Sequence, residues 1–420
     1  MKIKRELYQE LAKHLPAKEI SLIVGPRQAG KTTLMQSLKK TLDRQGERTL
    51  FLNLDVETDK QYFAAQQNLS DKIRLEFGDQ KGFVFIDEIQ RKENAGLFLK
   101  GLYDQNIPCK FIISGSGSLE LKEKIHESLV GRKRLFELNP VSFKEFLHYK
   151  TGYRYENNLS EFLGIEASKI PALLSEYLNF GGYPRIVTEP VLSEKLKIID
   201  EIFRGYIEKD IVYLLDIRRP ETFRQLIRLL AAQTGKLLNY SELAPQVGVS
   251  VPTLKKFLYY AQKTFVVKAI SPFFQNYRKE ITKSQTIYFY DLGMRNYALG
   301  VSGTLNNPNE LSFLFQNLIA NMLEEKLRWT GATLHFWRTA DQAEVDFVIK
   351  RGQLLLPIEV KYTSLKRPLL KKSLRSFIEK YSPETAYVVN LDFHDRIEVN
   401  GTTVRFLPFY ELMDSGSLFA

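Results

Sequence analysis

A phosphate-binding motif near the N-terminus constrains the fold of this chain more than any other feature. The apolar residues Ile20–Val24 lead directly into Gly25–Thr33, which reads GPRQAGKTT and matches the pattern G-x-x-x-x-G-K-T. In this pattern a buried strand enters a glycine-rich loop whose backbone N–H groups surround a phosphate chain, and a helix follows. We therefore expect a strand over Ile20–Val24 and an amphipathic helix from about Thr32 to Leu42.

The residue types in the loop indicate how a nucleotide would be held. The ammonium of Lys31 is expected to reach the β- and γ-phosphates, and the hydroxyl of Thr32 to take a place on Mg²⁺. Arg27 either contacts phosphate or pairs with a local acid. The predicted ATP-binding residues are Gly25, Pro26, Arg27, Gln28, Ala29, Gly30, Lys31, Thr32 and Thr33. The alternative is a glycine-rich turn without a ligand, which the flanking strand and helix patterns disfavour.

A second apolar segment, Gly82–Ile86, ends in the acid pair Asp87 and Glu88. We expect this strand to lie beside the loop strand. Asp87 would then support Mg²⁺, commonly through water, and Glu88 would polarise the attacking water as a general base. An apolar strand that ends in two acids is usually a solvated strand end, and the phosphate loop upstream favours the functional interpretation.

Two further candidates follow along the chain. The strand-like segment Lys110–Ser114 ends in small polar residues, so Ser114 or Ser116 is expected at the sheet edge where ligands gather. Either serine contacts the γ-phosphate or the attacking water, or it belongs to a plain polar turn. Arg132 either stabilises charge on the transferred phosphoryl group, in the same chain or in a neighbouring subunit, or is a solvated basic residue.

Length and composition limit the remaining possibilities. A chain of 420 residues is too long for one core, and its apolar fraction of 44% and charged fraction of 26% are ordinary for globular proteins. No segment has the roughly 18 uncharged apolar residues of a membrane span, and we expect neither a membrane partner nor a secretory signal. Cys109 is the only cysteine, which excludes internal disulfides and cysteine-based zinc sites and fits a reducing cytoplasm. The net charge of +11 permits nucleic-acid binding without demanding it.

The order of strand-like and helical patterns predicts four regions. Residues 1–140 alternate between the two patterns, which predicts a parallel α/β sheet with crossover helices. Residues 141–218 are mostly helical and are expected to form a lid or linker. Residues 219–300 contain three short helical patterns and then two strand-like segments, and residues 301–420 form a final α/β region. The strand-like segments in the first and third regions are Ile20–Val24, Thr49–Leu54, Gly82–Ile86, Lys110–Ser114, Phe265–Ile270 and Thr286–Tyr290.

Residues Leu237–Tyr260 are typical of a helix-turn-helix, and Thr264–Ile270 would follow as a strand of a wing. Ser241 is expected to cap the first helix, Gly248 suits the turn, and Ser250 is expected to cap the second helix. In this arrangement the residues that would meet DNA are Ser250, Thr253, Lys255, Lys256 and Lys263. The same shape also serves as a protein-docking module or a spacer, and the second helix is not densely basic.

The last region carries the pattern D-x(12)-E-x-K, formed by Asp346, Glu359 and Lys361. Alternation along a strand puts Glu359 and Lys361 on one face, close to Asp346 if the two strands pair. In Mg²⁺-dependent nucleases the two acids hold the metal and the lysine orients or activates the attacking water. The alternative is two charged strand faces joined by a Glu–Lys ion pair.

Motifs along nearly the whole chain resemble those of bacterial and archaeal AAA-type ATPases that carry a domain of unknown function, DUF4143, on their C-terminal side. The matching segments are Gly25–Thr33, Ile86–Gln90, Gly131–Arg132, Leu138–Phe146, Gly181–Pro184, Tyr206–Asp210, Lys283–Asp291 with Gly293, Glu344–Phe347 and Pro357–Lys361. The resemblance implies an α/β chain with an ATP-binding domain, a winged-helix-like middle region and a C-terminal fold similar to restriction endonucleases.

One residue departs from the family pattern. The helix before the C-terminal strands often carries an acid before an asparagine, and here Gln316 precedes Asn317. A neutral amide oxygen is a poorer partner for Mg²⁺ than a carboxylate. Two alternatives follow: a metal site that is weakened or shifted towards Glu344, or a nuclease-like fold retained for binding.

The sequence supports three functional hypotheses. The first is a cytoplasmic Mg²⁺-dependent ATPase whose attack of water on the ATP γ-phosphate controls the attached domains, with DNA as a candidate partner. The second is a DNA nuclease gated by ATP, and the third is a nucleotide-dependent switch that does not hydrolyse ATP. A homo-oligomer is compatible with each of them, because AAA-type domains often act as rings.

Overall fold

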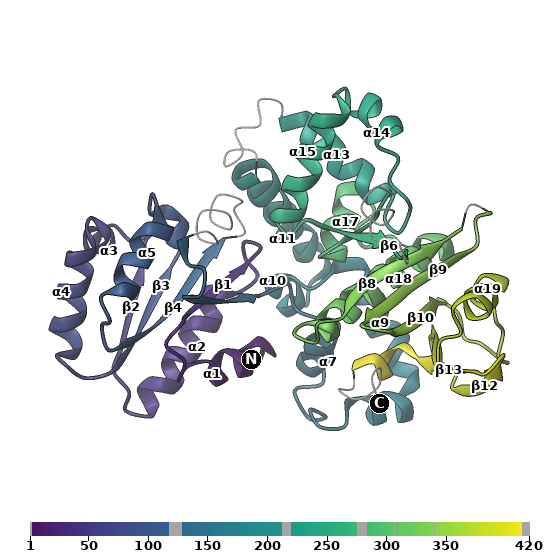
Figure 1. The fold of residues 1–420 in the computed structure, drawn as a ribbon, viewed down its shortest axis with the longest axis horizontal. Coiled ribbons are helices and arrows are strands. Elements are labelled where there is room, and N and C mark those ends of the chain that lie inside the picture. Colours follow the sequence, from purple (N-terminus) through teal and green to yellow (C-terminus); the bar gives the residue numbers. More distant parts are fainter. Residues whose placement is uncertain are drawn as a thin grey trace. The chain divides into compact units, whose positions relative to one another are not determined.

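The computed structural model describes residues 2–116, 128–211, 220–274, 284–305, 307–339 and 341–413, without the side chains of residues 116 and 208–211. The chain divides into two compact units (Figure 1). The N-terminal unit consists of residues 1–141, 201–220 and 259–266, and the C-terminal unit of residues 142–200, 221–258 and 267–420. No helix in the described ranges is both long and apolar enough to cross a bilayer.

The N-terminal unit is built on a parallel sheet, as predicted. Its strands within the described residues follow the order β2-β3-β4-β1-β5, and every neighbouring pair is parallel. The strands are β1 (Ile20–Gly25), β2 (Thr49–Asn53), β3 (Gly82–Asp87), β4 (Cys109–Ser116) and β5 (Lys133–Glu137). The helices are α1 (Leu7–Lys13), α2 (Lys31–Arg44), α3 (Glu57–Lys60), α4 (Gln66–Phe77) and α5 (Ala95–Asp104), and Arg204–Ile211 forms a π-helix.

The prediction that the acid-bearing strand lies beside the loop strand is wrong. β4 pairs with β1 on one side, where Ile23 faces Ser114, and with β3 on the other, where Ile86 faces Ile113. Proximity along the sequence does not set strand order in a parallel sheet, because each crossover helix can return the chain to either edge. The insertion of β4 puts the end of this strand between the phosphate loop and the acid pair.

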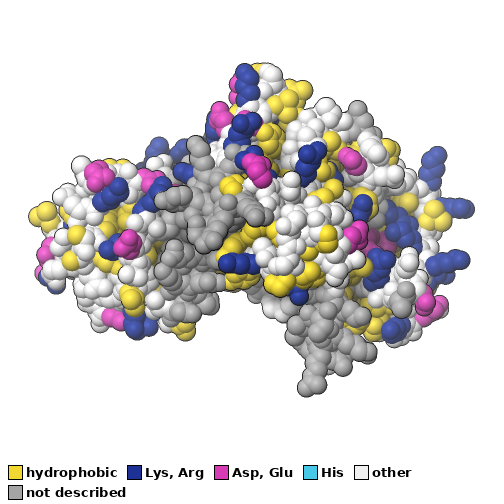
Figure 2. Space-filling view, turned by 90° about the horizontal axis from the view of Figure 1, so that it is seen from above, with side chains coloured by type: hydrophobic (Ala, Val, Ile, Leu, Met, Phe, Trp, Pro, Cys, Tyr) yellow, Lys and Arg dark blue, Asp and Glu magenta, His cyan; other side chains and the backbone are white. Residues whose placement is uncertain are grey.

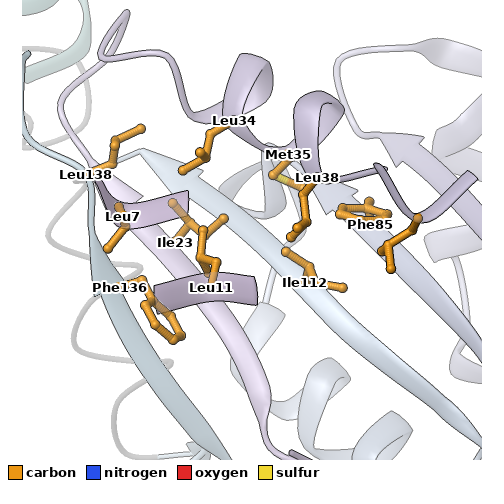
Figure 3. Packing of buried hydrophobic residues seen from close by; sticks show 11 residues of the cluster. Leu7, Leu11, Ile23, Leu34, Met35, Leu38, Phe85, Ile112, Phe136 and Leu138 are labelled. Atoms are coloured by element: carbon orange, nitrogen blue, oxygen red, sulfur yellow. The ribbon is translucent and has the colours of Figure 1, made fainter. Parts of the chain in front are cut away.

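A hydrophobic core holds the loop helix against this sheet. Leu7 and Leu11 of α1 and Leu34, Met35 and Leu38 of α2 pack on one face of the strands (Figure 3). They contact side chains from four strands, which are Ile23, Phe85, Ile112 and Phe136. All six residues of β1 are buried, so the other face of this strand is covered as well. This packing fixes the start of α2 at the carboxyl end of β1.

The C-terminal unit contains a mixed sheet with the strand order β12-β13-β11-β10-β9-β8-β6-β7 in the part of the chain that the structure describes. Its strands are β6 (Val267–Pro272), β7 (Thr286–Phe289), β8 (Thr333–Arg338), β9 (Glu344–Arg351), β10 (Leu354–Val360), β11 (Thr385–Asn390), β12 (Asp395–Val399) and β13 (Thr402–Pro408). Helices after residue 141 are α7 (Phe143–Lys150), α8 (Leu159–Ile165), α9 (Ile170–Phe180), α10 (Pro184–Thr188), α11 (Leu192–Phe203), α13 (Pro220–Ala232), α14 (Tyr240–Val247), α15 (Val251–Lys263), α17 (Leu292–Leu299), α18 (Pro308–Leu327) and α19 (Lys372–Tyr381).

The predicted helix-turn-helix corresponds to α14 and α15. Gly248 ends α14 in the left-handed conformation with φ of 71°, and the Ser250 hydroxyl accepts the N–H of Thr253 at 3.3 Å. The expected cap at Ser241 is wrong. The helix begins two residues earlier, so the side chain of Asn239 caps it and accepts the N–H of Glu242. Strands β6 and β7 follow as an antiparallel pair, and β6 also pairs with β8 in the larger sheet.

The glycine motif at Gly181 interlocks with the N-terminus of α17. Asp291 accepts the N–H groups of Gly182 at 2.7 Å and Met294 at 2.9 Å, and it is buried. Gly181 has φ of 71°, and a Cβ at this position would overlap the Asp291 carboxylate. The motif segment Gly181–Pro184 therefore has a packing role in the C-terminal unit. Of the other family segments, Lys283 and the side chains of 208–210 lie outside the described residues.

Candidate functional site

The predicted phosphate loop joins the end of β1 to the start of α2. A Cβ at Gly25 would overlap the carbonyl oxygen of Leu138, so the backbones approach too closely here for any side chain. Gly30 caps α2 with φ of 97°, a conformation that residues with a side chain rarely adopt. Both glycines of the motif are therefore required by the geometry of the loop.

Lys31 is folded back over this loop. Its side chain is 5% exposed, and its ammonium donates to the carbonyl oxygens of Gly25 at 3.1 Å and Pro26 at 2.8 Å. The guanidinium of Arg5 supports the loop from another direction and donates to the carbonyl oxygen of Ala29 at 2.7 Å. The sequence gives no local signal for Arg5, because it lies well before the motif and meets it only in the folded chain.

Asp87 joins three predicted site residues. Its carboxylate is fully buried, and Oδ2 accepts the hydroxyl of Thr32 at 2.7 Å. The other oxygen, Oδ1, accepts the hydroxyl of Ser114 from β4. The Ser114 oxygen in turn lies 3.3 Å from the N–H of Glu88. The structure thus brings the loop helix, β3 and β4 together at the carboxyl edge of the sheet, as a Mg²⁺–nucleotide site requires.

The donor set at this edge fits Mg²⁺. A hydroxyl and a carboxylate are oxygen ligands of the kind that Mg²⁺ prefers, and they are adjacent in the structure. Thr32 and Asp87 would hold the ion next to the phosphate loop, and this role stays a prediction.

Glu88 has a backbone conformation that is uncommon for a residue with a side chain. Its φ of 58° lies in the left-handed region, which costs on the order of 1 kcal/mol. Burial raises the pKa of its carboxyl group, the Lys31 ammonium opposes the shift and the Asp87 carboxylate adds to it. The amide of Gln90 donates to the Glu88 carboxylate. Strain and a raised pKa in one residue are typical of a functional carboxylate.

Arg132 lies at the opposite edge of the same sheet. Its carbonyl oxygen accepts the N–H of Ile20 at 2.9 Å, at the start of β1, whereas the loop begins at the end of that strand. Five residues at about 3.3 Å each put roughly 16 Å between the two ends. Its guanidinium pairs with Asp104 at 2.9 Å. The structure therefore does not bring Arg132 to the phosphate loop of its own chain, and a contribution to a neighbouring subunit stays a prediction.

The structure says less about the two remaining candidates near the loop, Arg27 and Ser116. Arg27 is exposed at the tip of the loop. The side chain of Ser116 lies outside the described residues, so the choice between Ser114 and Ser116 is informed only by the contacts of Ser114.

The predicted C-terminal pair, Asp346 and Glu359, lies on adjacent antiparallel strands. Phe347 of β9 faces Ile358 of β10, which places the two acids side by side. Burial, and next the Glu359 carboxylate, raise the pKa of Asp346 to about 8. Burial also raises the pKa of Glu359, against the effect of the Lys371 ammonium.

Protein groups already contact both of these acids. Asp346 Oδ1 accepts the Gln316 amide at 2.9 Å, and Asp346 Oδ2 accepts the N–H of Val360 at 2.7 Å. Glu359 pairs with the ammonium of Lys371. Lys361 donates instead to the carbonyl oxygen of Leu369 at 2.7 Å. The two predicted acids are thus brought together, and Lys371, which the sequence pattern does not include, contacts Glu359 where Lys361 was expected.

This arrangement does not fit a divalent cation. Both Asp346 oxygens accept N–H groups, and an ammonium contacts Glu359. Glu344, the alternative ligand, pairs with Arg338 at 2.9 Å. No group of three or more His, Cys, Asp or Glu side chains is placed to hold a metal ion within the described ranges.

Comparisons with known proteins give family matches along most of the chain. Family models match an AAA domain over residues 17–147, a domain of unknown function (DUF8612) over 171–305 and another (DUF4143) over 311–411. The chain thus matches an AAA domain on its N-terminal side and DUF4143 on its C-terminal side. The first and last matches carry the domain order that the motifs predicted.

Relatives that align with most of this chain are bacterial and archaeal proteins. An uncharacterised protein of Mycobacterium tuberculosis is 27% identical over 420 residues, which cover 99% of this chain and 86% of that protein. An uncharacterised Haemophilus influenzae protein is 25% identical over 373 residues, with 86% and 87% covered. Among solved structures, replication initiator DnaA bound to AMPPCP and single-stranded DNA aligns with 61% of this chain and 86% of its own at 12% identity. The TM-score of 0.30 is too low for that likeness to carry an argument.

Proposed function

We propose that this protein is a Mg²⁺-dependent ATPase in which Gly25–Thr33 binds ATP and water attacks its γ-phosphate. The observation that carries the proposal is the Asp87 carboxylate, which accepts hydroxyls from both Thr32 of the loop and Ser114 of β4. This buried acid thereby connects the phosphate loop to the end of β3, which Glu88 follows. The AAA-domain match over residues 17–147 supports the same assignment.

Each residue of this edge has a task in the proposed reaction. Lys31 exchanges its contacts with loop carbonyls for the β- and γ-phosphates, and the loop N–H groups hold the same chain. Bound Mg²⁺ would supply positive charge that neutralises the phosphates, held by Thr32 and Asp87. Glu88 orients the attacking water and takes its proton. Ser114 positions Asp87 and the Glu88 backbone, because its hydroxyl contacts both.

Two substitutions test the proposal. Lys31→Ala is expected to lose most nucleotide affinity, measured with a fluorescent ATP analogue, and Lys40→Ala on the exposed face of α2 serves as control. Glu88→Gln is expected to bind ATP and to hydrolyse it about 10²–10⁴-fold more slowly, with exposed Glu47→Gln as control. Equal turnover in wild type and Glu88→Gln would remove the role of Glu88. Tight ATP binding without hydrolysis in the wild type would instead favour the nucleotide-dependent switch.

We further propose that the ATPase cycle controls the winged-helix-like and DUF4143 regions and that DNA is the partner. The support is the helix α15, where Ser250 and Thr253 lie at the start and Lys255 and Lys256 are exposed. ATPase turnover with and without single-stranded, duplex and branched DNA tests the partner. Mass measurement in both nucleotide states tests the homo-oligomer in which Arg132 would serve a neighbour.

We place this activity in the cytoplasm, on the basis of the single cysteine, Cys109.

A nuclease gated by ATP is the second candidate function. The observation that favours it is the cross-strand placement of Asp346 and Glu359 in a region that matches DUF4143. It requires Lys371 to leave Glu359, since the acids are otherwise engaged. Cleavage in the presence of Mg²⁺ or Mn²⁺ and ATP, lost in Asp346→Ala, would support it. Intact single-stranded, duplex and branched DNA under those conditions would count against it.

A further inference from the structure

The DUF4143 region contains a buried carboxylate, Glu359, that forms an ion pair with a lysine from a later segment of the chain. The Glu359 side chain is 0% exposed, and its carboxylate contacts an ammonium. The ammonium that contacts it belongs to Lys371, the residue immediately before α19. A buried carboxylate without a cation costs several kcal/mol, so this ion pair is what makes the ionised form of Glu359 tolerable.

Donors from the protein also contact the neighbouring acid, Asp346. Asp346 uses one oxygen for the Gln316 amide and the other for the N–H of Val360. A glutamate in place of Gln316 would present an oxygen here, whereas the amide presents a donor. Gln316 therefore suits an Asp346 carboxylate whose partners are protein groups better than an Asp346 carboxylate that binds a metal ion.

The segment that carries Lys371 is rich in positive charge. The segment from residue 360 to residue 378 contains no acid, and its cations are Lys361, Lys366, Arg367, Lys371, Lys372 and Arg375. Figure 2 shows Lys and Arg side chains at the right-hand end of the molecule. These positive charges disfavour the approach of a divalent cation to the two acids.

We propose that the Lys371 ammonium is the resident cation of the Asp346–Glu359 site and keeps divalent cations out of it. The site then accepts a divalent cation only when the ammonium is absent. Both kinds of cation would meet the same Glu359 carboxylate, so they compete for one place. The DUF4143 region of this chain is accordingly a charge-neutralised acidic site, and its metal binding is governed by one lysine.

The test uses the full chain and Mn²⁺, which can be counted by electron paramagnetic resonance. Lys371→Met removes the charge and leaves an unbranched side chain that is one heavy atom shorter, and the neighbouring exposed lysine gives the control Lys372→Met. We expect Lys371→Met to bind one more Mn²⁺ per chain than wild type, with affinity at least about tenfold higher at that site. Lys372→Met should match the wild type. The phosphate loop is the same in all variants, so its contribution cancels.

Thermal unfolding gives a second readout. Lys371→Met should unfold at a lower temperature than wild type, and Mn²⁺ should restore its stability more than it changes the wild type. The double variant Glu359→Gln/Lys371→Met should regain stability without any dependence on Mn²⁺. Unchanged Mn²⁺ binding in a folded Lys371→Met variant would overturn the proposal.

The proposal can also be tested without any change at Lys371. Wild type and Asp346→Asn are expected to bind the same number of Mn²⁺ ions, because the acidic site is closed in both. A wild-type protein that binds one more ion than Asp346→Asn would overturn the proposal, whether or not Lys371→Met folds.

Discussion

Replacing Ser114 with alanine separates two roles that its position at the end of β4 allows. In one role its hydroxyl positions Asp87 and Glu88, and in the other it contacts the nucleotide directly. The hydroxyl donates to Asp87 Oδ1, and its oxygen lies 3.3 Å from the Glu88 N–H. The same N–H also lies 3.2 Å from Asp87 Oδ1, so neither group is left without a partner in Ser114→Ala. The stability cost is therefore that of one hydrogen bond to a carboxylate, about 1.5–3 kcal/mol.

The positioning role predicts a specific kinetic result. Turnover should fall by about 10–100-fold, because Glu88 and Asp87 lose part of the support that fixes their orientation. ATP affinity should change little, since Lys31 and the loop N–H groups are untouched. Steady-state ATPase kinetics and an independent binding titration separate the two effects.

A matched control distinguishes this effect from a general loss of stability. Ser70 is 1% exposed, lies in α4 and donates to the carbonyl oxygen of Gln66 and the side chain of Gln105. Ser70→Ala should cost similar stability and leave turnover unchanged at temperatures where the protein stays folded. The positioning role is refuted if Ser114→Ala keeps wild-type turnover, or if its ATP affinity falls by the same factor as its turnover.

Three further changes have expected outcomes. Gly25→Ala should abolish ATP binding, measured by titration, because the added Cβ would overlap the Leu138 carbonyl oxygen. Gly181→Ala should lower the unfolding temperature of the C-terminal unit and leave ATP affinity intact, because its Cβ would overlap the Asp291 carboxylate. Burial, and next Lys110, lower the pKa of His14 to about 4, so the unfolded chain binds the extra proton between that pH and about 6.5. The free energy of unfolding should fall by up to about 3 kcal/mol as the pH drops through this window. Urea unfolding of His14→Gln should lack this loss. Equal pH profiles for the variant and the wild type would contradict the prediction.

The local features of the phosphate loop could be predicted from the sequence because the signals are local. An apolar run, two glycines and an amphipathic pattern lie within one short segment, and the structure has β1, the loop and α2 in that order. Thr32 and Asp87 meet as expected, since both follow elements whose ends share the carboxyl edge of the sheet. Fixed geometry at the ends of parallel strands made that contact predictable.

Features that depend on the path of the chain could not be predicted in this way. The place of β4 between β1 and β3 is decided by which edge each crossover takes, and no residue of β3 encodes it. Arg132 is a similar case. Its distance from the loop follows from the parallel pairing of β5 with β1, which places the start of β5 at the far edge. A motif match for Arg132 identifies the residue but not the edge of the sheet on which it lies.

The C-terminal site shows why a motif of ligand residues does not by itself determine a metal site. The pattern of Asp346, Glu359 and Lys361 correctly predicts neighbouring acids, because two paired strands bring them together. The charge of the site is decided elsewhere, by the return of the chain after β10 that places Lys371 against Glu359. A buried pair of acids needs positive charge from some source. Here the Lys371 ammonium supplies that charge, so no metal ion requires a carboxylate at position 316 and Gln316 fits the site. Gln316 and Lys371 are therefore two parts of one change from the nuclease pattern.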